Sequence, residues 1–256
     1  MSGSKATGAG SEMDVVLQDA IPEAQMLAAQ ARLPQVYPVD MVDWLRVDGA
    51  YRAQLAQKAA LIAERRDAVI AVLPGAGAAV SELLEVALVT MAQMPAFVVE
   101  TGRVRCPDGI WVELDRADPF LTLSRLLQED FCIHQKVASE HVLTAALLGF
   151  PAAWTLAEKI GHPLSRIHAP VGRYDPDIAA RVQRMFDMIT PGRVLWRANL
   201  LRYDSPALFQ PHTEAAPRPV GQPSSAYIRS ERQCILRLPV TGAVVFSIHT
   251  TMVRAS

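Results

Sequence analysis

Apolar residues recur with helical spacing in the first half of the chain. Residues 48–72 begin with an aspartate suited to capping a helix and are followed by turn residues 74–77, so we expect one helix there. Residues 81–94 are apolar on nearly every side and predict a second, deeply buried helix. Two short apolar runs at 104–106 and 110–114 flank a Pro-Asp-Gly turn and predict a hairpin.

The second half of the chain mixes helical and strand patterns. Asp118-Pro119 and Asp175-Pro176 each place a capping aspartate before a proline, which is typical of the start of a helix. Residues 194–203 have the composition of a strand, and the runs 227–238 and 243–253 predict a second hairpin. Short connections of this kind favour antiparallel pairing, so the expected fold class is α+β.

The expected organisation is a short tail followed by one domain. Residues 1–12 are rich in Gly, Ser and Ala, lack the apolar segment of a signal peptide and predict a disordered tail. Residues 13–256 contain no internal repeat, and their length suits a single core. Residues 205–225 carry five prolines, and we interpret them as a flap or lid.

Composition and charge narrow the functional classes. Half of the 256 residues are hydrophobic, and the net charge of −1 comes without a basic patch, which argues against nucleic-acid binding. The longest uncharged apolar stretch, residues 142–157, is interrupted by Pro151 and is shorter than the roughly 20 residues of a membrane-spanning helix. We therefore expect a cytoplasmic protein that binds neither nucleic acid nor membranes.

Several common motifs do not occur in the sequence. Cys106, Cys132 and Cys234 are far apart, which argues against a zinc or iron–sulfur site and favours small buried side chains. The chain has no Gly-x-Ser-x-Gly elbow and no Gly-x-Gly-x-x-Gly fingerprint. Hydrolase and nicotinamide-binding functions therefore have little support.

Among six histidines, His168 has the most suggestive surroundings. It lies between Ile167 and Val171, and Pro170 stiffens the segment, which we interpret as a loop. An apolar environment with one imidazole suits the axial ligation of haem iron. The alternative is a histidine with a purely structural role, which is the more common situation for a lone histidine.

Two polar clusters on predicted strands offer further candidates. Arg197 lies in a strand whose two faces are both apolar, so it is either an inward-pointing cation that needs an anionic partner or a strand-edge arginine in a structural ion pair. Glu231 shares one face of its strand with Tyr227, Arg229 and Gln233. That face is either solvated, which the pattern favours, or a polar pocket wall in which Glu231 pairs with Arg197 or with a cationic substrate.

The order of several segments resembles one known family, the haem-dependent oxidative N-demethylase-like proteins, first catalogued as a domain of unknown function. The resemblance covers about residues 36–253. The segments identify the family only when they are taken together, since no single segment is sufficient. The matching segments are Gln128-Glu129-Asp130-Phe131-Cys132, Phe150 to Trp154, Glu158 to Gly161, Ile167-His168-Ala169-Pro170-Val171, Trp196-Arg197-Ala198-Asn199, Arg229-Ser230-Glu231-Arg232-Gln233 and Leu236 to Pro239.

This resemblance implies a PAS-like antiparallel sheet with flanking helices that forms a single haem-binding domain. It implies a haem-dependent monooxygenase that holds haem b and removes a methyl group from a small amine as formaldehyde, with dioxygen or peroxide as oxidant. His168 would be the axial iron ligand, Arg197 would lie near the haem, and Glu231 would border the substrate pocket. Since the chain has no flavin or iron–sulfur motif, electrons would come from a separate reductase or ferredoxin.

Two alternatives to an enzyme stay open. The chain is either a PAS-like sensor of haem or of a small ligand without turnover, or a cofactor-free structural protein in which His168 is only packed. The lack of an output domain or oligomerisation helix in the sequence favours the enzyme over the sensor. Family members also continue beyond the position of Ser256, so we expect a C-terminally shortened homologue or a fragment.

Overall fold

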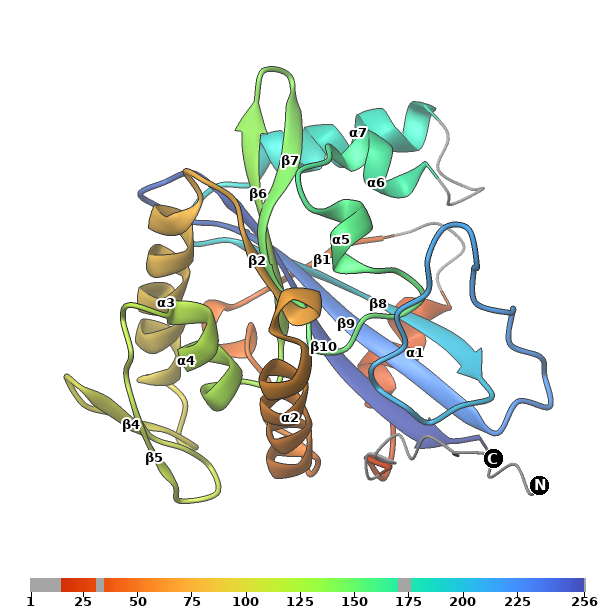
Figure 1. The fold of residues 1–256 in the computed structure, drawn as a ribbon, viewed down its shortest axis with the longest axis horizontal. Helices are drawn as coiled ribbons and strands as arrows, with labels where there is room; N and C mark the ends of the chain where they lie inside the picture. Colours follow the sequence, from red (N-terminus) through yellow and green to blue (C-terminus); the bar gives the residue numbers. More distant parts are fainter. Residues whose placement is uncertain (1–14, 31–34, 170–175, 256) are drawn as a thin grey trace, which may run out of the picture.

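The fold of the chain is α+β, as the sequence predicts. The structure is a computed structural model that describes residues 15–30, 35–169 and 176–255. Seven strands form one sheet in the order β1-β8-β9-β10-β6-β7-β2, and all neighbours pair antiparallel (Figure 1). The strands are β1 (Tyr37–Val39), β2 (Ile70–Val72), β6 (Asp130–Val137), β7 (Glu140–Leu147), β8 (Val194–Tyr203), β9 (Tyr227–Arg237) and β10 (Val244–Arg254).

A second, small sheet projects from one end of the molecule. It contains β3 (Val98–Val99), β4 (Arg103–Arg105) and β5 (Trp111–Glu113). Strands β4 and β5 form the hairpin predicted around Pro107-Asp108-Gly109, and Gly109 has the positive φ of 82° that this turn requires. The hairpin extends away from the large sheet beside α3 and α4 (Figure 1).

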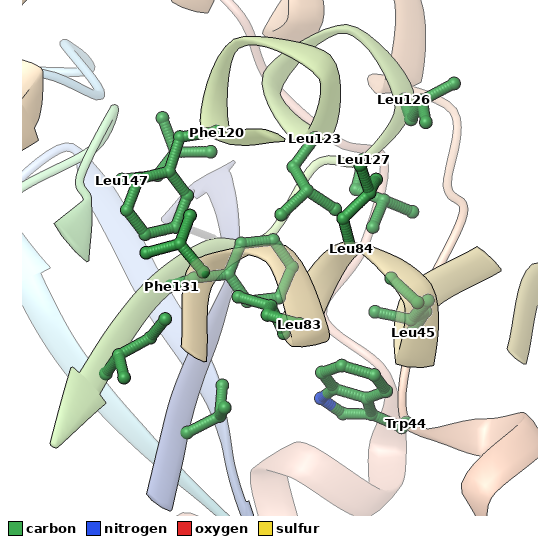
Figure 2. Packing of buried hydrophobic residues seen from close by; sticks show 14 of the residues in the cluster. Trp44, Leu45, Leu83, Leu84, Phe120, Leu123, Leu126, Leu127, Phe131 and Leu147 are labelled. Carbon is green, nitrogen blue, oxygen red and sulfur yellow. The ribbon is translucent and has the colours of Figure 1, made fainter. Parts of the chain in front are cut away.

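Helices cover both faces of the large sheet, because its strands carry apolar side chains on both faces. Phe131 and Ile133 of β6 pack in the main core, whereas Cys132 packs in a separate cluster on the other face. The main core is formed with α2 (Tyr51–Val69), α3 (Gly77–Met91) and α4 (Pro119–Leu126), and Figure 2 shows the part of it around Leu83 and Phe131. The other face carries α5 (Leu156–Lys159), α6 (Leu164–His168) and α7 (Pro176–Met188).

Two short elements complete the N-terminal part. Helix α1 (Glu23–Ala29) packs against β8, and a 3₁₀ turn, η1 (Met41–Asp43), precedes Trp44. Trp44 is fully buried, and its indole N–H donates a hydrogen bond of 2.8 Å to the Ser247 hydroxyl of β10. This contact fixes the N-terminal segment to the centre of the sheet.

The sequence expectations for local structure are mostly confirmed. Asp118 caps α4 by accepting the Leu121 N–H, and Pro119 occupies the first helical turn. The three cysteines are buried thiols, as expected. The helix predicted for residues 48–72 ends earlier, at Val69, because Ile70–Val72 pair with β7 as an edge strand. Asp175 and residues 1–12 lie outside the described residues.

A buried ion pair connects α2 with the centre of the sheet. The Lys58 ammonium lies 3.0 Å from the Asp130 carboxylate, and both side chains are fully buried. Lys58 also donates to the carbonyl oxygens of Gln128 and Glu129, while Asp130 accepts the main-chain N–H groups of Gly149 and Phe150. The Gln128-Glu129-Asp130 motif is therefore a structural connection. No described helix is long and apolar enough to cross a membrane.

Candidate functional site

His168 is the last residue of α6, on the sheet face covered by α5, α6 and α7. The sequence predicts a loop here, but the structure has a short helix that is anchored by Leu164, which packs against Phe186 and Ile235. The half-buried imidazole places Nδ1 2.9 Å from the Leu164 carbonyl oxygen, one turn earlier. A carbonyl can only accept a hydrogen bond, so Nδ1 donates, and Nε2 carries the lone pair that metals bind.

The surroundings of His168 favour its neutral form. Burial lowers the pKa of the imidazole, and the positive charges of Lys159 and Arg197 lower it further. The hydrogen bond to the Leu164 carbonyl opposes these effects only in part. A neutral imidazole at physiological pH is the form that ligates a metal without first losing a proton.

Two other histidines lie against Phe186 of α7, and one of them, His134, interacts electrostatically with His168. The rings of His134 and His141 both meet the ring of Phe186 edge-on, with centroids 5.4 and 5.3 Å from it. Burial, with smaller contributions from His141 and His168, lowers the pKa of His134 to about 3. His134 and His141 therefore add polar but uncharged rings to this region, which the sequence analysis did not anticipate.

Arg197 is a half-buried cation on β8, directly opposite Gln233 of β9. Burial lowers the pKa of its guanidinium, and the negative charge of Glu231 opposes this effect. Within residues 15–30, 35–169 and 176–255, no hydrogen bond or ion pair engages its side chain. The structural ion pair of the expected alternative is therefore not formed among these residues, although the edge position is: β1 pairs with β8 only at Val194–Trp196, one residue before Arg197. A half-buried cation without a contact partner suits an anionic or oxygen-bearing ligand.

Glu231 belongs to a buried polar wall on β9. Its carboxylate accepts hydrogen bonds from Arg229 Nε at 3.1 Å and from Asn199 Nδ2 and Gln233 Nε2 at 3.0 Å each. Glu231 is only 7% exposed and Arg229 only 1% exposed. The solvated face that the pattern favoured is therefore wrong, because the 205–225 loop and the segment after β7 cover this part of β9.

Arg229 is the cationic partner of Glu231, a role that the sequence analysis did not assign. Its Nη1 donates to the Leu208 carbonyl at 2.9 Å, and its Nη2 donates to the Phe150 carbonyl at 2.5 Å. The two-residue spacing places Arg229 and Glu231 on one strand face, but spacing alone does not show which arginine the carboxylate contacts. Arg197 acts on Glu231 only through a longer electrostatic interaction.

Residues 205–225, predicted as a flap or lid, are attached to the helices that carry His168. Glu214 accepts hydrogen bonds from Lys159 of α5 at 2.7 Å and from both terminal nitrogens of Arg166 of α6 at 2.9 and 3.0 Å. Lys159 also donates to the Ile167 carbonyl at 2.9 Å. We call these contacts of Glu214 with Lys159 and Arg166 the Glu214 bridge.

The donor chemistry of this face fits a haem group. The anchored, neutral imidazole of His168 is the kind of side chain that would hold the iron, and Arg197 is a cation available to an anionic or oxygen-bearing group. Apolar surface from Ile167, Trp154 and Phe246 lies in the same region. The cavity of about 200 Å³ between α6 and α7 is bordered by Leu164 and Ser165 but by neither His168 nor Arg197, so the fit rests on the chemistry of the side chains and not on this cavity.

The fold and this face together define an α+β protein with a candidate site for a histidine-ligated cofactor. A comparison with models of known protein families then identifies the family. The model described as "haem-dependent oxidative N-demethylase, alpha subunit-like" matches residues 35–256, and the chain belongs to this family. The search of curated proteins finds no match.

Proposed function

We propose that this chain is a haem b enzyme that oxidatively removes a methyl group from a small methylated amine and releases formaldehyde. The observation that carries the proposal is that His168 and Arg197 lie on the same helix-covered face of the sheet. The imidazole is held neutral by burial and oriented by Leu164, and the guanidinium has no contact partner among the described residues. Membership of a haem-dependent oxidative family supports the same activity.

Each residue has a defined task in this proposal. His168 Nε2 would hold the iron, and the haem would supply the oxidising chemistry once dioxygen or peroxide is present. Arg197 would donate hydrogen bonds to the bound oxidant and stabilise negative charge that develops on it. With dioxygen, one oxygen atom leaves in formaldehyde and the other in water, and two electrons and two protons are consumed. A separate reductase or ferredoxin would supply those electrons.

Glu231 would hold the substrate amine. Its carboxylate accepts three hydrogen bonds, so about one of its roughly four lone-pair positions is left for a substrate N–H. Arg229 cancels the charge of Glu231 at short range, so the attraction for an ammonium group is local and directional. The orientation of the amine, rather than a strong net charge, would therefore bring the methyl group to the oxidant.

The direct test is an absorption spectrum of the full chain produced with added haem precursor, recorded before and after dithionite. We expect a Soret band that shifts on reduction, and formaldehyde release when methylated amines are supplied with an electron donor. Well-folded protein without a Soret band would overturn haem binding. A redox-active haem without formaldehyde from any methylated amine would instead support a PAS-like sensor.

A substitution of Arg197 separates its role from haem binding. Arg197→Gln should keep the Soret band but lower turnover about 100- to 1,000-fold, the usual effect of removing one donor to a developing negative charge. Arg193→Gln is the matched control, because Arg193 is exposed just before the same strand. Unchanged formaldehyde release by Arg197→Gln would remove Arg197 from the mechanism.

A further inference from the structure

A cavity of about 610 Å³ lies on the opposite face of the sheet from His168. It is bordered by α1 and the segment before it, by residues 46–49, and by side chains of β8, β9 and β10. Its volume lies within the roughly 300–1,000 Å³ of typical small-molecule sites. Neither His168, Arg197 nor Glu231 borders it, so the cavity is separate from the proposed haem site.

The base of this cavity contains a buried cation with unused donors. Arg232 of β9 is 3% exposed, and its Nη1 donates to the Trp44 carbonyl at 2.9 Å and to Cys234 Sγ at 3.0 Å. Its Nη2 donates to the Asp43 carbonyl at 2.8 Å. Two of the five N–H groups of this guanidinium remain without an acceptor among the described residues. No carboxylate in the described part of the chain forms an ion pair with Arg232, so the groups that contact it there are neutral.

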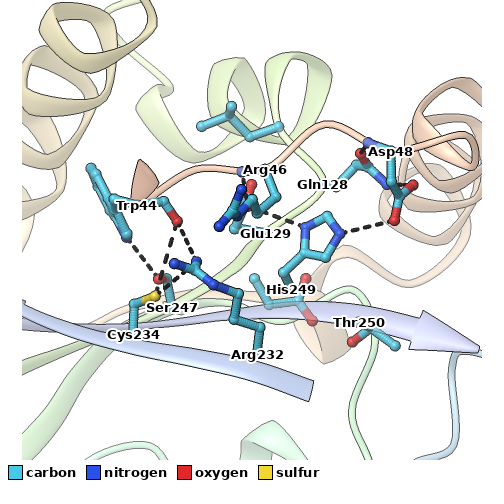
Figure 3. A network of polar contacts seen from close by, with 12 residues as sticks. Trp44, Arg46, Asp48, Gln128, Glu129, Arg232, Cys234, Ser247, His249 and Thr250 are labelled. Atoms are coloured by element: carbon cyan, nitrogen blue, oxygen red, sulfur yellow. Dashed lines mark hydrogen bonds and ion pairs between the residues drawn. The ribbon is translucent and has the colours of Figure 1, made fainter. Parts of the chain in front are cut away.

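The carboxylates near Arg232 are already engaged by a buried histidine. His249 of β10 places Nε2 3.0 Å from Asp48 and Nδ1 3.2 Å from Glu129. Burial lowers the pKa of His249, but the hydrogen bonds and charges of Asp48 and Glu129 outweigh this and raise it to about 9. The imidazole is therefore an imidazolium at neutral pH. Figure 3 shows His249 and Arg232 on the same side of the paired strands β9 and β10.

The cavity combines one guanidinium that lacks an ion pair with an apolar wall. Of the three cationic side chains that border it, Arg46 lies 3.8 Å from Asp43, and His249 lies between Asp48 and Glu129. Arg232 is therefore the bordering cation that no carboxylate of the described residues contacts. Trp196 forms part of the wall, and its ring lies 5.4 Å from the Arg232 guanidinium. An anionic group on an apolar body matches this combination better than a cation or a purely polar solute.

We propose that this cavity binds a small organic acid, whose carboxylate takes the unused N–H groups of Arg232 while its apolar body lies against Trp196. A planar guanidinium matches a carboxylate geometrically, and the burial of Arg232 strengthens each hydrogen bond. The site is independent of haem, so it exists in the protein with or without the cofactor.

The test measures binding of benzoate to the full chain by titration calorimetry at pH 7. Benzamide and benzylamine are the controls, since they have the same ring but are neutral and cationic. We expect one benzoate per chain and binding at least about tenfold weaker for both controls. Equal binding of all three, preference for benzylamine, or no binding of benzoate at millimolar concentrations would each overturn the proposal.

Variants locate the binding. Arg232→Gln should abolish benzoate binding, whereas Arg237→Gln should not, because Arg237 also donates to main-chain carbonyls of this domain but lies on the opposite face of β9. If Arg232→Gln fails to fold, Ala24→Trp serves instead, since Ala24 is exposed and borders the cavity. Its bulky side chain should block benzoate while the fold persists. Full benzoate binding by folded Ala24→Trp or Arg232→Gln would refute the assignment.

Discussion

The Nδ1 atom of His168 lies 2.9 Å from the carbonyl oxygen of Leu164, one helical turn before it. This hydrogen bond selects the tautomer in which Nε2 is the ligating atom, and it fixes the plane of the ring. Leu164 is itself held by Phe186 and Ile235 in a buried cluster. The orientation of the imidazole therefore depends on the packing of α6 as well as on His168.

Replacement of His168 should remove haem without unfolding the chain. We expect His168→Ala to lose the Soret band while its far-ultraviolet circular dichroism is unchanged, because the half-buried ring makes no contribution to the main core. His162→Ala is the matched control, since His162 is exposed and lies six residues away. Normal haem content in His168→Ala would show that another residue binds the iron.

The Glu214 bridge should affect haem retention more than stability. Glu214→Gln removes the charge that Lys159 and Arg166 share, and we expect faster transfer of haem to apomyoglobin with little change in the free energy of unfolding. Hydrogen bonds from Arg166 and Lys159 hold the pKa of Glu214 at about 2, so the bridge persists in mildly acidic buffer. Haem transfer at the wild-type rate would limit Glu214 to a surface contact.

The buried ion pair of Lys58 and Asp130 should be essential for stability. Lys58→Met leaves the Asp130 carboxylate buried without its cation and should lower the free energy of unfolding by about 3–5 kcal/mol. Lys136→Met, which removes the exposed pair with Asp187, should cost less than about 1 kcal/mol. Denaturant titration of both variants measures the difference, and equal costs would contradict the structural role given to Lys58.

The contribution of His249 to stability should be lost between pH 6.5 and 9. His249 has a folded-state pKa of about 9, above its ordinary value of 6.5, so its contribution is complete below pH 6.5 and is lost as the pH rises through 9. This amounts to about 3.5 kcal/mol at most, since one pKa unit corresponds to about 1.4 kcal/mol. The pKa values of His134, His141 and His168 are lowered, so these histidines act in the opposite direction: their cost to the folded state disappears as the pH rises through 6.5. This gain is complete within about one pH unit above 6.5, whereas most of the loss from His249 comes at higher pH.

The difference between wild type and His249→Gln isolates this effect. The buried thiols also lower stability at alkaline pH, because their pKa values are raised, but they contribute equally to both proteins. Chemical denaturation across pH 6–9.5 should therefore give a stability difference that shrinks as the pH rises. A difference independent of pH would mean that His249 does not carry a proton between Asp48 and Glu129.

Local patterns were sufficient to predict the strands that form both sites. The alternation in residues 227–253 predicts the β9–β10 hairpin, and the Asp-Pro pairs predict the starts of helices, because these features depend on neighbours in the sequence. The burial of Arg229 and Glu231 was not predictable in this way. It depends on Leu208 and Phe150, which approach β9 from distant parts of the chain.

Local sequence patterns also did not predict which charged residues contact one another. The sequence shows Lys58 in a helix and Asp130 in a strand, but nothing in their spacing indicates that they meet. The Glu214 bridge and the contacts of His249 with Asp48 and Glu129 join segments 48 to 201 residues apart. Such contacts are set by the tertiary arrangement, so their discovery required the structure.

Strand β9 carries neighbouring charges that point to opposite sides of the sheet. Glu231 contacts Asn199 on the side of His168, whereas Arg232 contacts Trp44 on the other side. Because side chains alternate along a strand, the insertion or deletion of one residue before Glu231 would exchange their positions. A carboxylate would then enter the cavity bordered by Trp196, and an extra guanidinium would enter the face that carries His168. Homologues that keep both sites should therefore tolerate length changes in the loops around β9 but none within it.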